Sequence, residues 1–185
     1  MERLKALNAE LLASMQAITC AAFAIDALNA SILKVLPTPS ATKMAWRKNR
    51  TKRSRQIFET LRRAFKMGPQ SRTKIKTLLD QLSDARDTAV HPPARSQRAQ
   101  RHARLPVDVD PAFNMFRARY AIVAVGAAVE LIESAAKAET AQHQGVSERM
   151  AALLELVHPI GSHWRRSKAG KLFKELQRRA EASDE

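Results

Sequence analysis

The opening stretch of the chain is organised by apolar residues that recur every three or four positions and stop at two prolines. This spacing places them along one side of an α-helix that buries a single face. The residues of this stripe are Leu4, Leu7, Leu11, Met15, Ile18, Ala22, Ile25 and Leu33. Pro37 and Pro39 end the pattern, because proline lacks the N–H that a helix interior needs. The sequence therefore predicts a first helix over residues 2–36.

Few glycines, many alanines and leucines and little aromatic content indicate that the whole chain is all-α. A second helix is predicted to begin between residues 40 and 55 and to end near 66. Four more are predicted over 71–90, 111–138, 147–158 and 162–182. The inward stripe of the 111–138 helix is Phe113, Phe116, Tyr120, Ala124, Ala127 and Leu131. We expect a bundle of four or more helices over residues 1–138, followed by a basic helical extension over 139–185.

One arginine lies within the apolar stripe of the 71–90 helix. The stripe consists of Ile75, Leu78, Leu79, Leu82, Ala89 and Val90, and Arg86 falls on the same side. Because a guanidinium stays charged, an inward arginine needs a carboxylate, an anionic ligand or another chain's surface. Pro92 disfavours helical geometry at His91, so the helix should end near Val90. We expect this ending to turn the imidazole back into a cleft shared with Arg86.

This segment resembles the R-x-x-x-x-H motif of the HEPN superfamily (higher eukaryotes and prokaryotes nucleotide-binding). Arg86 and His91 have the motif's spacing, Asp87 is the polar residue that usually follows the arginine, and His91 is followed by Pro92. Domains of this superfamily are antiparallel helical bundles with the motif at the end of one of the later helices. The resemblance covers the first 138 residues and does not extend to the C-terminal segment.

The resemblance implies RNA cleavage that needs neither a metal ion nor a cofactor. His91 would be the general acid or base, and imidazole suits proton transfer near neutral pH. Arg86 would hold the phosphoryl oxygens as a bidentate fork, and Asp87 would orient the imidazole. One Arg and one His supply half of an acid–base pair, so a homodimer with both motifs in one cleft is expected. The superfamily also implies a toxin or defence role, with an antitoxin or nucleotidyltransferase as partner.

Asp26 is an acidic residue close to the apolar face of the first predicted helix. Such a carboxylate needs a partner if it faces the core. HEPN-like domains often place an acid in this helix, so we expect Asp26 to be a buried structural partner of Arg86.

The formal charge of +14 favours nucleic acid as the partner. An acid-free run beside Trp46 is a candidate phosphate-binding surface; its basic residues are Lys43, Arg47, Lys48, Arg50, Lys52, Arg53 and Arg55. A second candidate is the 92–108 loop, in which arginine recurs every third residue at Arg95, Arg98, Arg101 and Arg104. That spacing would place the arginines along one basic edge if the loop becomes helical on contact with RNA. A disordered loop is equally consistent with the sequence.

Cys20 is the only cysteine, which excludes an intramolecular disulfide and favours a reducing compartment. Its place among alanines suggests a buried structural thiol. No uninterrupted apolar run is long enough to span a bilayer. We therefore expect a cytoplasmic protein without a membrane partner.

Two other functions remain open from the sequence. A HEPN-like module could bind nucleic acid or a nucleotide without cutting it, with the motif as a binding or interface relic. Alternatively, Arg86 is a paired core residue and His91 caps the helix C-terminus. Variants at these two positions separate the three cases.

Overall fold

In the part of the chain that the structure describes, the protein is helical apart from a short two-stranded ribbon. The computed structural model describes residues 2–91, 98–101, 108, 109, 111 and 116–182. The helices are α1 (Glu2–Val35), α2 (Ser40–Lys48), α3 (Arg53–Ala64), α4 (Pro69–Val90), α6 (Ala118–Ala136), α7 (Gln144–Arg166) and α8 (Lys168–Glu181). The ribbon pairs β1 (Gln100–Arg101) with β2 (Asp108–Val109) in antiparallel fashion. The predicted all-α class is confirmed.

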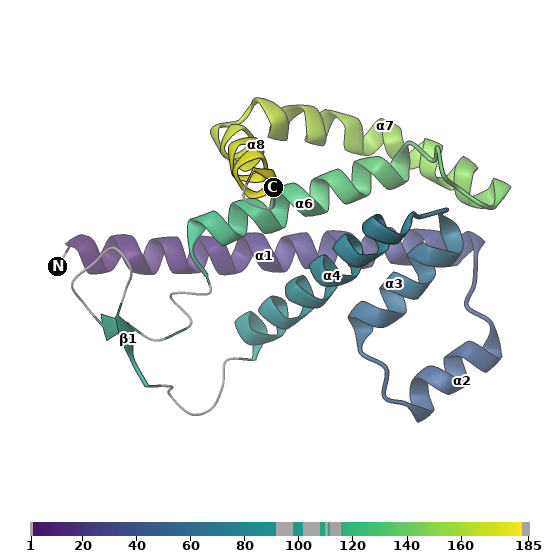
Figure 1. Cartoon of the computed structure of the whole chain (residues 1–185), viewed down its shortest axis with the longest axis horizontal. Helices are drawn as coiled ribbons and strands as arrows, with labels where there is room; N and C mark the ends of the chain where they lie inside the picture. Colours follow the sequence, from purple (N-terminus) through teal and green to yellow (C-terminus); the bar gives the residue numbers. More distant parts are fainter. Residues whose placement is uncertain (1, 92–97, 102–107, 110, 112–115, 183–185) are drawn as a thin grey trace.

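Helix α1 is the element on which the bundle is assembled. It runs the length of the molecule, with α4 and α6 beside it and α3 and α7 also in contact (Figure 1). Ile18, Ile25 and Ile32 recur every seven residues and are at most 3% exposed, so one face of α1 lies in the core. The N-terminal turns extend past the other helices, and Leu4 is 61% exposed. The predicted inward stripe is therefore wrong at its beginning.

The ends of α4 follow from local sequence. Gly68 is the N-cap and Pro69 occupies the first turn, where its missing N–H has no partner to lose. At the other end His91 is the C-cap, with φ −126° and ψ 71°, so the helix stops before Pro92 as the sequence predicts. Leu79 and Leu82 are buried at 3% and 4% exposure.

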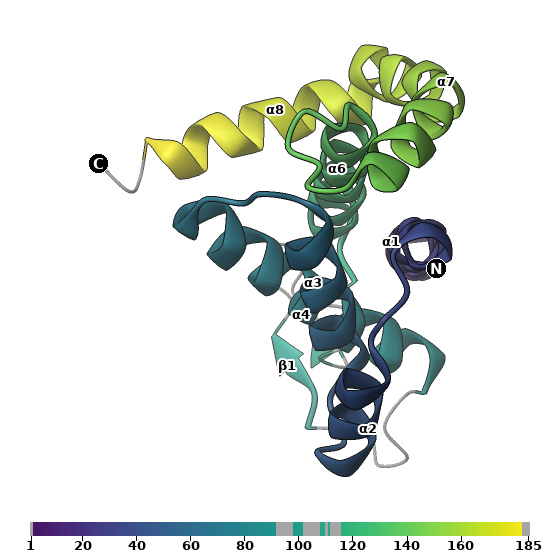
Figure 2. The same ribbon diagram turned by 90° about the vertical axis from the view of Figure 1, so that its right-hand side faces the viewer.

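The region expected to form the second helix forms two helices, because a turn interrupts it. The N–H of Thr51 donates to the carbonyl of Trp46 at 2.9 Å, and that of Arg50 donates to Arg47 at 3.3 Å. These two bonds close the end of α2 as a Schellman motif. Arg50 has a positive φ of 47°. The chain thereby changes direction, and Figure 2 shows α2 lying beyond α3 and away from α6, α7 and α8.

The C-terminal segment is packed onto the bundle, so the expected boundary after 138 does not coincide with a break in packing. Val146 and Met150 of α7 are fully buried in the same core as α1. Gly126 of α6 lets α8 approach closely, since a Cβ there would lie 2.5 Å from the Phe173 ring.

The expected helix break at His158 is also wrong, because α7 continues through Pro159 to Arg166. Proline forfeits one helical hydrogen bond, but contacts beyond it favour continuation. Gly161 is buried, and Arg165 forms an ion pair with Glu133 of α6.

Two further expectations about burial are corrected. Tyr120, placed in the inward stripe of α6, is 55% exposed, whereas Phe116 is 1% exposed. Cys20, expected to be buried, is exposed on α1. Both residues lie beside buried positions, Ala21 and Ala121, so they occupy the side of the helix that faces solvent. Phe113, another residue of that predicted stripe, lies outside the described residues.

Helix α1 is long and apolar enough to cross a membrane by length and composition. The core helix of a soluble protein meets the same criterion, and Ile18, Ile25 and Ile32 are buried against other helices.

Candidate functional site

Arg86 lies in the last part of α4 and is fixed by two carboxylates. Its Nε and Nη2 donate to Asp87 Oδ1 at 3.0 and 2.6 Å. Its Nη1 lies 3.6 Å from Oδ2 of Asp26 on α1. The side chain of Arg86 is 24% exposed and that of Asp26 25%. The expected pairing of Asp26 with Arg86 is therefore present in the structure, at a partly exposed position.

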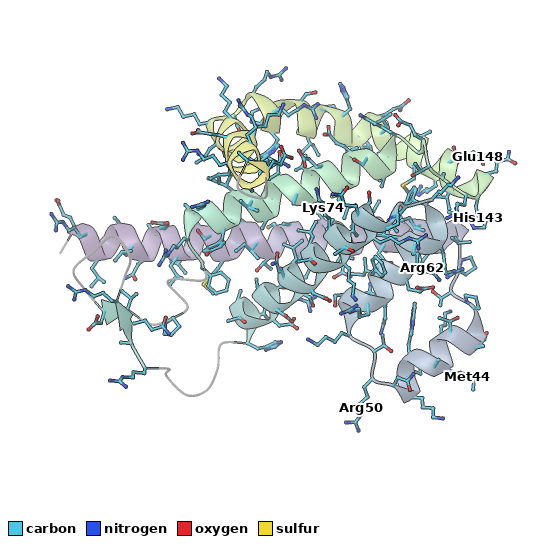
Figure 3. All side chains as sticks on the ribbon, viewed as in Figure 1. Met44, Arg50, Arg62, Lys74, His143 and Glu148 are labelled. Carbon is cyan, nitrogen blue, oxygen red and sulfur yellow. The ribbon has the colours of Figure 1, made fainter. Side chains whose placement is uncertain are left out.

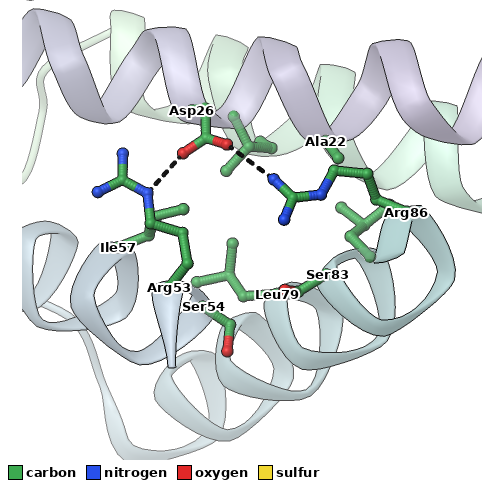
Figure 4. A pocket seen from close by; sticks show the side chains of 10 residues that line it. Ala22, Asp26, Arg53, Ser54, Ile57, Leu79, Ser83 and Arg86 are labelled. Atoms are coloured by element: carbon green, nitrogen blue, oxygen red, sulfur yellow. Dashed lines mark hydrogen bonds and ion pairs between the residues drawn. The ribbon is translucent and has the colours of Figure 1, made fainter. Parts of the chain in front are cut away.

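Asp26 also binds a second guanidinium, that of Arg53, which the sequence predicts to lie on a phosphate-binding surface. Nε of Arg53, at the first turn of α3, donates to Asp26 Oδ1 at 2.8 Å. Figure 4 shows the carboxylate between the two arginines, one from α3 and one from α4. One carboxylate of α1 thus bonds both α3 and α4. Arg53 is therefore paired with a carboxylate of α1, although its side chain stays 44% exposed, and its place on a phosphate-binding surface stays a prediction.

A small cavity lies beside the ion pairs of Asp26 with Arg53 and Arg86. It is lined by Ala22, Ile25, Asp26, Arg53, Ser54, Ile57, Leu79, Leu82, Ser83 and Arg86. Its volume is ≈ 20 Å³, which is room for about one water molecule. A phosphodiester does not fit in this cavity, so an RNA phosphate can reach Arg86 only from the solvent side.

His91 does not line the cavity beside Arg86, and the shared cleft expected from Pro92 is not formed within one chain. Helix α4 keeps its regular hydrogen bonding to the end, where the N–H of His91 donates to the carbonyl of Asp87 at 2.8 Å. Positions 86 and 91 are then about 140° apart around the helix axis. Arg86 is directed to α1 by Asp26, whereas His91 is exposed at the helix end.

The two polar residues after Arg86 have partners other than His91. Oδ1 of Asp87 accepts both hydrogen bonds from Arg86, and the hydroxyl of Thr88 donates to the carbonyl of Asp84 at 2.9 Å. The expectation that Asp87 orients the imidazole is therefore corrected. Within the described residues, Asp87 fixes the guanidinium instead.

Carboxylates of α4 pair with two more members of the basic run. Arg55 Nη2 lies 3.0 Å from Asp80, and Lys52 Nζ lies 3.5 Å from Asp84. Ser54 adds a hydrogen bond of 2.8 Å to Asp80. A sequence signal for this pairing exists, because Asp80, Asp84 and Asp87 follow the i, i+4, i+7 spacing of one helix face. The basic run contains no acidic residue in the sequence, but the fold places carboxylates of α4 beside its second half.

The remaining members of the basic run lie on α2 and its closing turn. Lys43, Arg47, Lys48 and Arg50 are exposed, and none of them forms an ion pair within the described part of the chain. In the 92–108 loop, Arg98 is exposed and Arg101 belongs to β1, 3.8 Å from Asp108. Gln100 and Arg101 form a short strand here, and the helical edge expected on contact with RNA stays a prediction. Arg95 and Arg104 lie outside the described residues.

Over residues 2–91, 98–101, 108, 109, 111 and 116–182, no group of three or more His, Cys, Asp or Glu side chains is arranged to hold a metal ion. No family model matches this chain, and neither the curated proteins nor the solved structures contain a significant match.

Proposed function

We propose that the protein is a metal-independent endoribonuclease of HEPN type. The observation that carries this proposal is the position of Arg86 and His91 at one end of α4. Asp26 and Asp87 fix the guanidinium, and the imidazole is open to solvent at the helix C-cap. A positive field from the net charge of +14 would draw RNA toward such a site.

The chemistry needs only groups that these residues can supply. A neutral imidazole removes the proton of the RNA 2′-hydroxyl, and the resulting oxyanion attacks the adjacent phosphorus. The bond to the 5′-oxygen breaks, and a protonated imidazole donates a proton to that oxygen. Arg86 stabilises the charge that builds on the phosphoryl oxygens. The products are a 2′,3′-cyclic phosphate and a 5′-hydroxyl, and no metal ion takes part.

Two copies of the chain are needed for this mechanism. One chain provides a single motif imidazole, which does not line the cavity beside Arg86. A two-fold symmetric dimer would bring His91 of one copy and Arg86 of the other to the same phosphate, with the second histidine as the acid. A solution mass that stays monomeric at all concentrations would contradict this arrangement.

The test is cleavage of a panel of end-labelled single-stranded RNAs in the presence of EDTA. Wild type should cleave, and His91→Ala should lose roughly 10²-fold or more in rate. Arg86→Lys, which keeps the charge beside Asp26, should also lose activity because an ammonium is not a bidentate fork. His158→Ala removes an exposed histidine from α7 and should cleave as wild type does. Dependence on magnesium would contradict the proposal.

A second candidate is a HEPN-like module that binds nucleic acid or a nucleotide without cutting it. The engagement of Arg86 by two carboxylates favours it, because a paired guanidinium has fewer donors left for phosphate. In this case wild type would bind RNA without cleaving it, and His91→Ala would keep the wild-type affinity.

The wider role belongs to the same proposal. We place the enzyme in the cytoplasm as a toxin or defence component whose activity an antitoxin or nucleotidyltransferase partner would control. Co-purification of such a partner with the intact chain, and its inhibition of cleavage, would test this role.

A further inference from the structure

Residues 40–50, which we call the α2 arm, differ from the rest of the bundle in burial and in charge. Helix α2 has no buried residue, and the arm lies to one side of the bundle (Figures 1 and 2). It contributes to no part of the hydrophobic core. Core packing therefore does not explain why this segment is helical or why it is basic.

The four cations of the α2 arm are the unpaired part of the basic run. Lys52, Arg53 and Arg55 follow the arm and each pairs with a carboxylate of α1 or α4. By contrast, the arm's own cations have no ion pair among the described residues; they are Lys43, Arg47, Lys48 and Arg50. Lys43 and Arg47 are one helical turn apart and so project in similar directions. Their charge is available to an external anion.

Arg50 adds an independent observation. It occupies the left-handed position of the Schellman motif that closes α2, with φ 47°. Glycine is the usual residue there, because a Cβ is sterically unfavourable in this conformation. Figure 3 shows the Arg50 side chain at the tip of the α2–α3 turn, directed away from the bundle. A side chain in a strained position that makes no ion pair with any described residue points to a role outside the fold.

We propose that the α2 arm binds the sugar-phosphate backbone of single-stranded RNA. This proposal rests on the proposed function and identifies the element that holds the RNA substrate. Four exposed cations around a short helix match a chain of regularly spaced phosphates. A lipid surface fits less well, because insertion needs an apolar face and Met44 is the exposed large apolar residue of α2. Trp46 is partly buried, so it supports the arm and is not needed as a stacking platform.

The test is fluorescence anisotropy with a labelled 20-nucleotide RNA in a His91→Ala background, so that no cleavage occurs during the titration. The arm variant combines Lys43→Gln, Arg47→Gln, Lys48→Gln and Arg50→Gly. The control variant removes four exposed cations from α8 by Lys168→Gln, Lys171→Gln, Lys174→Gln and Arg178→Gln. Both variants change the net charge equally, so only the position of the lost charge differs.

The arm variant should bind at least about 30-fold more weakly than its parent at 100 mM salt. The slope of log K against log salt should fall by about 3 units, since each single-strand phosphate contact contributes about 0.7. The control variant should change the slope by less than about 1 unit. Equal losses in both variants would overturn the proposal, because binding would then follow net charge alone. Unchanged binding by the arm variant would overturn it as well.

The single variant Arg50→Gly separates the effect of Arg50 on stability from its effect on RNA binding. It should raise the urea midpoint of unfolding, because glycine relieves the left-handed strain. It should also weaken RNA binding several-fold and lower the salt slope by about 0.7. A variant that is stabilised but binds as tightly as its parent would overturn the role of Arg50.

Two competitors distinguish RNA from other anionic partners. Polyglutamate of equal charge, or vesicles containing phosphatidylserine, should displace the RNA only at much higher concentration; displacement at equal charge concentration would overturn the assignment to RNA. Arm-dependent binding together with an inactive wild type would contradict the nuclease proposal alone. Cleavage by wild type with arm-independent binding would contradict the arm proposal alone.

Discussion

The two halves of the basic run have opposite surroundings although their sequences look alike. Between Asp26 and Glu59 the chain has no acidic residue. The second half nevertheless lies against carboxylates of α1 and α4, and it consists of Lys52, Arg53 and Arg55. The first half lies on the α2 arm, whose cations form no ion pair among the described residues. Whether a positive segment is structural or available for binding thus depends on distant residues that fold beside it.

Among the variants that test this comparison, Asp26→Ala is expected to lower the free energy of unfolding most. The change leaves the guanidiniums of Arg53 and Arg86 without their shared partner at a partly buried position. Removing one partner of a fully buried pair costs several kcal/mol, and partial exposure with the remaining Asp87 contact reduces the loss here to about 2 kcal/mol. Urea unfolding followed by circular dichroism measures it.

The control for Asp26 is Glu175→Ala, which breaks the exposed ion pair with Arg179 on α8. This pair is an i, i+4 surface contact, so its loss should change stability by no more than about 0.5 kcal/mol. Equal stability of wild type and Asp26→Ala would show that the carboxylate does not fix the two helices.

A smaller effect is expected from two matched arginine substitutions. Arg53→Gln removes a cation that bonds Asp26 at 2.8 Å, so we expect a loss of about 1 kcal/mol. Arg47→Gln removes a cation of the α2 arm and should leave the unfolding free energy within about 0.3 kcal/mol of wild type. RNA binding should respond in the opposite order, with the Arg47 variant weaker. If both variants lose the same stability, the distinction between the two halves fails.

The smallest effect concerns the pH dependence of an exposed pair on α3. Arg62 donates to Glu59 at 2.7 and 2.9 Å, and this hydrogen bond holds the pKa of Glu59 below its usual value. A lowered folded-state pKa stabilises the protein above the unfolded pKa, and this contribution disappears as pH falls through the folded value. Arg62→Gln should therefore cost about 0.3 kcal/mol at pH 7 and less than that at pH 3. Urea midpoints at the two pH values measure the difference.

Much of the helical architecture was predictable because each boundary has a local cause. Pro37 ends α1, Gly68 and Pro69 start α4, and His91 before Pro92 ends it. Non-local facts were not predictable in the same way. The strained turn at Arg50 contradicts residue preference, and Pro159 remains inside α7 because later residues dock on α6.

The candidate site was predicted in its parts and not in its arrangement. The expected pair of Asp26 and Arg86 is present. Periodicity places Arg86 inward and Asp26 near the apolar face of α1, and the HEPN resemblance suggests that the two are partners. The partners of Arg53 and Asp87 were missed, because they depend on how α3 and α4 face each other. The separation of His91 from the cavity beside Arg86 follows from the regularity of α4 up to its last turn.

The double use of Asp26 makes the two proposed RNA contacts interdependent. A phosphate that draws Arg86 toward solvent leaves the whole negative charge of Asp26 to Arg53, at the first turn of α3. The first turn of α3 closely follows the α2 arm in the chain. Substrate bound at the end of α4 would therefore strengthen the bond that holds α3, and with it the α2 arm, to α1. Binding energy from the two contacts would then be greater together than the sum of each alone.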